Sequence, residues 1–297
     1  MLRLLVALAT LALVLVPRPS EACASCACGD PTLTALGAEQ PFQGRVRVWS
    51  ELRYRTDRTG ASGVDAMGLA EWRNDVGIAW APASWLFLSL NVPLLTRAVQ
   101  FVDLSQDRGS GIGDSEVRAK FYVWKDREFA PDHLVSLVAG LKLPTGSVRV
   151  QSGTGLPLSS EAQPGSGTLD PIGGLAYSYF GGRISGFASG TFYLPIHARG
   201  VFQPGPSLRT TLAGQVQAHR LLAVRLGADT RLDSRAKVEG TVDPHSGGFI
   251  AFASPELLLS PVQDWTFYVQ ARVPVLNLLQ GVHREGPFWG AGVTVDL

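Results

Sequence analysis

The chain has 297 residues and a formal net charge of +1, which gives no reason to expect a nucleic-acid partner. Charged residues make up only 17% of it, whereas roughly a quarter is usual in soluble proteins. Once the leader described next is removed, the length suits one large β domain or two small ones.

The start of the chain has the composition of an export signal. Arg3 supplies a positive charge, residues 4–16 form an apolar core, and small residues follow Pro17. That core is too short to cross a bilayer as a helix, which takes about 20 residues. We therefore expect a signal peptide over 1–22, a Cys-rich periplasmic lead-in over 23–42, and the folded domain over 43–297.

All three cysteines, Cys23, Cys26 and Cys28, fall in the lead-in, so no disulfide can join parts of the folded domain. Three interpretations stay open. The tail is an exposed peptide whose thiols have no special role, or Cys23 carries a lipid anchor, although Ser20 and Glu21 depart from the usual lipobox. In the third, the thiolates bind a soft metal ion such as Cu or Zn. No other cofactor is expected.

Residues 112–124 alternate with the side-chain period of two that marks a β-strand. One face carries Ile112, Asp114, Glu116, Arg118, Lys120, Tyr122 and Trp124, and the other carries Val117, Ala119, Phe121 and Val123. A soluble sandwich would bury the apolar face. A membrane barrel would turn the apolar face to lipid and the charged face to its lumen.

Similar segments recur along the chain and predict about twelve strands, most of them near the 9 to 11 residues that cross a membrane. The predicted strands are 43–55, 67–80, 85–94, 112–124, 134–143, 169–180, 183–194, 207–219, 222–233, 248–259, 265–275 and 287–297. The last strand alternates to the end of the chain, as outer-membrane barrels do for recognition by the barrel assembly machinery, although they usually end in an aromatic residue rather than Leu297.

The connections between these strands alternate in length. Short ones are expected at 81–84, 181–182, 220–221 and 260–264, with a medium one at 125–133, and long ones at 56–66, 95–111, 144–168, 195–206, 234–247 and 277–286. Short turns at one rim and long loops at the other are typical of outer-membrane barrels. The sequence therefore predicts an all-β fold: a single antiparallel up-and-down transmembrane β-barrel with short periplasmic turns and long extracellular loops, located in the cell outer membrane.

The charged faces of these strands are the candidate functional residues, because a barrel would turn them to its lumen. The candidates are Arg45, Arg47, Glu51, Arg53, Asp114, Glu116, Arg118, Lys120, Arg225, Asp229, Arg231 and Arg272. Within the row Asp114, Glu116, Arg118 and Lys120 we expect the four charges to neutralise one another. Twelve strands fall between the filled lumen of about eight strands and the open channel of about sixteen, so both a pore and a plugged scaffold stay open.

Two short motifs resemble a known family. Gly111-Ile-Gly-Asp114 with Lys120, followed one strand later by Gly140-Leu-Lys-Leu-Pro-Thr-Gly146, is similar to the phenol meta-pathway-like family of outer-membrane transporter β-barrels. The resemblance covers residues 109–146. It implies a barrel that passes a small molecule, and hydrophobic or aromatic compounds are suggested by the family name alone.

The function expected from these observations is an outer-membrane channel or transporter for a small-molecule substrate, working as a monomer in outer-membrane lipid. No nucleophile elbow, zinc-protease motif or phosphate loop is present, so an enzyme is not expected. The alternative is a non-transporting scaffold barrel whose Cys-rich tail serves a metal or a periplasmic partner.

Overall fold

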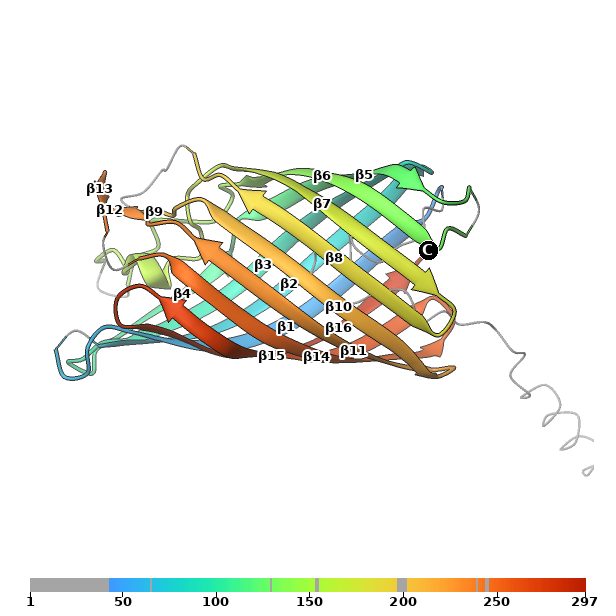
Figure 1. The fold of residues 1–297 in the computed structure, drawn as a ribbon. Coiled ribbons are helices and arrows are strands. Elements are labelled where there is room, and N and C mark those ends of the chain that lie inside the picture. Colours follow the sequence, from blue (N-terminus) through green and yellow to red (C-terminus); the bar gives the residue numbers. More distant parts are fainter. Residues whose placement is uncertain are drawn as a thin grey trace, which may run out of the picture.

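The computed structural model describes residues 43–64, 66–128, 130–152, 155–196, 202–238, 240–243 and 246–297. The signal peptide, the lead-in and its three cysteines lie outside this range, so those predictions stand as made. Within it, twelve antiparallel strands close into a barrel, which confirms the predicted fold class (Figure 1). No described helix is long and apolar enough to cross a membrane.

Each strand of the wall pairs with the next along the chain, and the first pairs with the last to close the barrel. One of the twelve is interrupted and counts as β4 plus β5. The wall consists of β1 (Val46–Thr59), β2 (Met67–Ala83), β3 (Leu86–Gln100), β4 (Gln106–Ile112), β5 (Ser115–Lys125), β6 (His133–Leu143), β7 (Asp170–Gly181), β8 (Ile184–Tyr193), β10 (Ser207–His219), β11 (Leu222–Asp233), β14 (Gly248–Val262), β15 (Trp265–Leu279) and β16 (His283–Asp296).

The two faces of the wall differ as the alternation predicts. On β1, Val48 and Leu52 are 38% and 48% exposed on the outside, while Trp49 and Glu51 are 2% and 1% exposed inside. The same alternation leaves most of the large exposed apolar side chains on the outer surface. The outside is therefore apolar, and the polar and charged side chains turn inward.

The strand predicted at 112–124 is broken by Gly113 and Asp114, and this corrects two face assignments. β3 pairs with β4 on one side of the break and with β5 on the other, and the register shifts by one residue between them. A one-residue shift reverses the faces, so Ile112 points outward rather than into the lumen. A second irregularity between Tyr122 and Trp124 likewise turns Trp124 outward, where it is 52% exposed.

Short turns and long loops lie at opposite ends of the barrel, with the C-terminus at the short-turn end (Figure 1). Two of the predicted long loops are wrong. The segment 95–111 is mostly strand, because β3 and β4 pair out to Gln100 and Gln106, and the loop at 277–286 shrinks to the residues between Leu279 and His283. At the long-loop end, β9 (Phe202–Gln203), β12 (Lys237–Val238) and β13 (Thr241–Val242) form a small separate sheet.

The segment 144–169, here called the inward loop, folds back into the lumen. It carries one 3-10 turn, η1 (Ser160–Ala162), and Leu158 and Ala162 pack against Val99 of β3. Arg97 of β3 also donates to its backbone, at Gln163 O over 2.6 Å. The sequence predicted an exposed extracellular loop here, and the structure differs from it at the C-terminal end of the segment. Leu158 and most of residues 162–168 are buried inside the barrel, whereas many residues over 145–161 remain exposed.

Candidate functional site

A cavity of about 1250 Å³ occupies the part of the lumen nearer the long loops. It is lined by the inner faces of the wall strands, by the inward loop and by residues of the small outer sheet. Polar and apolar side chains both contribute, among them Tyr193, Phe252 and Phe288. The cavity is therefore a large polar chamber with some aromatic surface.

The charges that line this chamber balance. Among the described residues there are ten cations, Arg53, Arg55, Arg73, Arg97, Arg118, Lys142, Arg149, Arg209, Arg231 and Arg272, and ten carboxylates, Asp57, Glu71, Asp114, Glu116, Glu161, Asp170, Asp229, Asp233, Asp243 and Glu285. A balanced lining can exist only if most of these charges are paired, because isolated charges in a partly enclosed space are costly.

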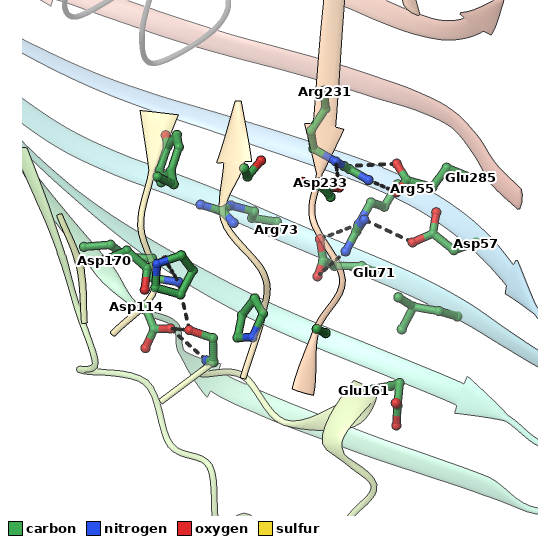
Figure 2. A pocket seen from close by; sticks show the side chains of 18 of the residues that line it. Arg55, Asp57, Glu71, Arg73, Asp114, Glu161, Asp170, Arg231, Asp233 and Glu285 are labelled. Atoms are coloured by element: carbon green, nitrogen blue, oxygen red, sulfur yellow. Dashed lines mark hydrogen bonds and ion pairs between the residues drawn. The ribbon is translucent and has the colours of Figure 1, made fainter. Parts of the chain in front are cut away.

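Eight of the ten cations form ion pairs, some between neighbouring strands and others within one strand or with a strand further round the barrel. Glu71 of β2 accepts from Arg55 of β1 at 2.8 Å and from Arg97 of β3 at 2.5 Å. Figure 2 shows Arg55 beside Glu71 and Asp57, and Arg231 beside Asp233 and Glu285. Glu71 thus ties three adjacent strands together, whereas Arg231 of β11 reaches Glu285 of β16, a strand that it does not pair with in the sheet.

The part of the cavity deepest in the barrel, here called the cavity floor, has a second group of charges. Asp75 is fully buried and is paired with Arg53 and Arg73, and it accepts from Asn91 at 2.8 Å. Arg118 of β5 is paired with Glu116, with Nε 3.0 Å from Oε2. The Arg118 guanidinium also donates to the hydroxyl of Tyr193 on β8.

Below the floor, towards the short turns, the lumen is filled by side chains. This lumen plug is one apolar cluster whose members are at most 9% exposed: Trp49, Ala79, Ala81, Phe87, Tyr122, Leu134, Val138, Ala176, Phe180, Phe187 and Ala213. A second cluster of Ala223, Leu258 and Tyr268 adds to it. The sequence left pore and plug open, and the structure is plugged at this end.

Four of the predicted lumen charges lie at the level of the plug and are buried in it. Arg47 is paired with Asp296, with Nε 2.6 Å from Oδ1, and Arg225 donates to Glu256 at 2.9 Å. Glu51 accepts from Tyr268 at 2.9 Å. The fourth is Lys120, which is fully buried.

Lys120 is 0% exposed, and its Nζ has no hydrogen-bond partner among the described residues. Its ammonium lies 5.0 Å from the centre of the Tyr122 ring. The expected mutual neutralisation of Asp114, Glu116, Arg118 and Lys120 is therefore wrong for two of the four. Only Glu116 and Arg118 pair, because Lys120 lies deeper, inside the plug, and Asp114 at the strand break reaches the inward loop instead.

The remaining predicted residues also face the lumen. Arg45 is paired with Asp296 at the short-turn end. Asp229 accepts from Thr211 at 2.6 Å and lies 3.6 Å from Arg272. Alternation in the strand predicted at 67–80 would have identified Glu71, Arg73 and Asp75, and the same argument applies to Asp170 and Arg209. Glu285 could not have been identified in this way, because it fell in the segment predicted as a loop, whereas the structure places it in β16.

The two sequence motifs meet at the strand break. Asp114 accepts from the backbone N–H of Gly146 at 3.0 Å and from the N–H and hydroxyl of Ser166 at 2.7 and 2.6 Å. Thr145 donates to the carbonyl of Gly113 at 2.9 Å. The motifs together therefore form a clamp, the Asp114 clamp, that fixes both ends of the inward loop to the wall.

No three His, Cys, Asp or Glu side chains among the described residues are placed to hold one metal ion together. The predicted thiolate ligands lie outside that range, so the prediction of a soft-metal site stays untested.

The barrel is similar to an outer membrane channel from Pseudomonas putida F1, with a TM-score of 0.66, 12% identity, and coverage of 86% of this chain and 96% of that one. The translocator domain of autotransporter NalP from Neisseria meningitidis gives a TM-score of 0.49 and 9% identity, with coverage of 86% of this chain and 88% of that one. The CymD monoaromatic hydrocarbon channel gives a TM-score of 0.47 and 7% identity, with coverage of 90% of this chain and 91% of that one. No family model and no curated protein sequence matches the chain. With a TM-score of 0.66 at 12% identity, the first of these likenesses shows that the chain has the fold of that channel.

Proposed function

We propose that this chain is a channel of the Gram-negative outer membrane that passes a small molecule, and that the structure is its closed state. The observation that carries the proposal is the chamber of about 1250 Å³ inside a closed barrel with an apolar outer surface. A chamber of this size has room for a small molecule, since ligand sites commonly measure about 300 to 1,000 Å³. The apolar outside suits lipid, and the charged inside suits a wetted path.

The direction of the path follows from the two ends. Outer-membrane barrels place long loops outside the cell and short turns in the periplasm. The chamber therefore faces the exterior, and the lumen plug separates it from the periplasm. Passage requires side chains of the plug, such as Phe87 and Phe187, to move.

We also propose kinship with the phenol meta-pathway-like transporters, supported by the joint role of the two motifs. Gly113 and Asp114 break the strand, and Thr145 and Gly146 come from the second motif to meet them. A Cβ on Gly146 would lie 2.5 Å from the Cα of Gly165, so the motif glycine is required by close packing. Hydrophobic or aromatic cargo rests on the family name alone.

The second candidate function is a non-transporting scaffold, and the packed plug favours it. We further propose that the protein is a monomer, that the barrel assembly machinery assembles it, and that it has no enzymatic activity, with or without a metal at the Cys-rich tail.

Solute flux into liposomes that contain the purified protein separates the two candidates. Phe187 of β8 is 2% exposed in the plug, and Phe192 of the same strand faces outward. Phe187→Ala should raise the rate of swelling with small neutral solutes, because it removes a ring from the barrier, while Phe192→Ala should leave the rate unchanged. If neither the wild type nor Phe187→Ala passes any solute, the scaffold is the correct function.

A further inference from the structure

One cation at the cavity floor stands apart from the ion pairs. Eight of the ten cavity cations have a carboxylate within 4.0 Å. For the other two, Arg149 and Arg209, no ion pair exists within the described part of the chain. Arg149 belongs to the inward loop, whereas Arg209 belongs to the wall strand β10, so its backbone is fixed by pairing on both sides.

The Arg209 side chain is held in place by an aromatic ring. Its guanidinium carbon lies 4.1 Å from the centre of the Tyr193 ring, and Tyr193 is only 4% exposed. Tyr193 in turn is fixed by Arg118, which donates to its hydroxyl. Arg209 itself remains exposed within the cavity. Its N–H groups therefore face the chamber, and stacking on the ring reduces the conformational entropy lost on binding.

The surroundings of Arg209 carry more positive than negative charge. Arg209 interacts electrostatically with Glu116, and Arg118 already pairs with that carboxylate. Two arginines thus share one carboxylate around Tyr193. The next lumen-facing side chain beyond Arg118 on β5 is Lys120, which is buried with no hydrogen-bond partner in the described part of the chain. Among the described residues, the charge without a carboxylate partner is therefore positive both at the cavity floor, where it is Arg209, and in the plug, where it is Lys120.

We propose that the cavity floor binds a small organic carboxylate, and that Arg209 is the residue that pairs with it. A planar guanidinium matches a carboxylate with two parallel hydrogen bonds, and one uncompensated positive charge suits a monoanion. The Tyr193 ring beneath the guanidinium keeps the N–H groups of Arg209 in position. The inference rests on the proposed channel function for its biological meaning, but the binding itself can be measured without transport.

Equilibrium dialysis of the full-length protein in detergent, with labelled benzoate and its neutral analogue benzamide as probes, tests the proposal. Benzoate should bind about tenfold more tightly or better, the ratio expected for hydrogen bonds to a charged group. Arg209→Gln should remove this preference and leave benzamide binding unchanged. Arg149→Gln, which removes the other unpaired cavity cation, is the matched control and should leave the preference intact. Arg209→Lys should retain part of it.

Equal binding of benzoate and benzamide by the wild type would overturn the proposal. A preference for benzoate that survives Arg209→Gln would overturn it too, provided that the variant is folded, which the altered gel mobility of a folded barrel shows. The liposome assay keeps this result separate from the channel function. Arg209-dependent binding without flux, even after Phe187→Ala, sustains the site and rejects the channel. If benzoate and benzamide instead pass at equal rates, and Arg209→Gln does not change those rates, the channel function is supported and the carboxylate site is rejected.

Discussion

The Asp114 clamp offers a direct test of how the inward loop is held in the lumen. In Asp114→Asn, one carboxylate oxygen becomes an NH₂ group. The retained oxygen can still accept from Gly146, but the NH₂ group faces the N–H of Ser166, which needs an acceptor. The variant therefore removes the hydrogen bond from the backbone N–H of Ser166 while it preserves the volume of the side chain.

The size of the effect follows from these contacts. A hydrogen bond to a charged group is worth about 1.5 to 3 kcal/mol. Asp114 is half-buried, so the lower value applies because solvent screens the charge. A loss of about 1.5 kcal/mol raises the open fraction of the inward loop about tenfold.

Trypsin reports this opening, because Arg149 of the inward loop lines the chamber, where the protease reaches the chain only after the loop leaves the lumen. When reclosing is fast, the rate of cleavage follows the open population, so Asp114→Asn should be cut after Arg149 about tenfold faster than wild type. Asp103→Asn is the control: Asp103 accepts from the N–H and hydroxyl of Ser105 in the turn after β3, away from the clamp. Equal rates in wild type and Asp114→Asn would refute the role of the clamp.

Three further predictions concern the wall, the clamp and the plug. Val48→Arg should destabilise the protein in vesicles by about 2 to 4 kcal/mol, whereas Val238→Arg, equally exposed but outside the wall, should have little effect in the same urea titration. Gly165→Ala should speed cleavage of the inward loop, because its Cβ would lie 2.5 Å from backbone, and Gly173→Ala, whose Cβ meets nothing within 4 Å, should not. Lys120→Met should raise unfolding free energy by about 1 kcal/mol or more, since it removes a buried unpaired ammonium; a less stable variant would contradict this.

Alternation along the strands was enough to predict the barrel and the direction of most lumen charges. On β1 the alternation is uninterrupted from Arg47 to Arg53. Arg47, Glu51 and Arg53 are separated by even numbers of residues, so all three turn inward. The pattern fails where the register shifts. At Gly113 the shift arises because β3 changes its partner from β5 to β4, which depends on pairing between strands and leaves no mark in the alternation.

The plug and the inward loop could not be read from the sequence for a similar reason. Trp49 and Phe187 fall on lumen-facing positions, but alternation does not say whether rings on different strands meet across the barrel. Nor does the composition of 144–169, rich in Gly, Ser and Pro, distinguish a loop in solvent from one fixed inside by Asp114 and Arg97. These features depend on contacts between distant segments.

The separation of those contacts along the chain implies an order of folding. The Asp114 clamp joins residues 52 apart at most, whereas Arg47 and Asp296, which fasten the first strand to the last, are 249 apart. Closing the longer loop costs about 1.4 kcal/mol more entropy, or tenfold in probability. We therefore expect the inward loop to be fastened to an open curved sheet, which then wraps around a lumen already partly filled.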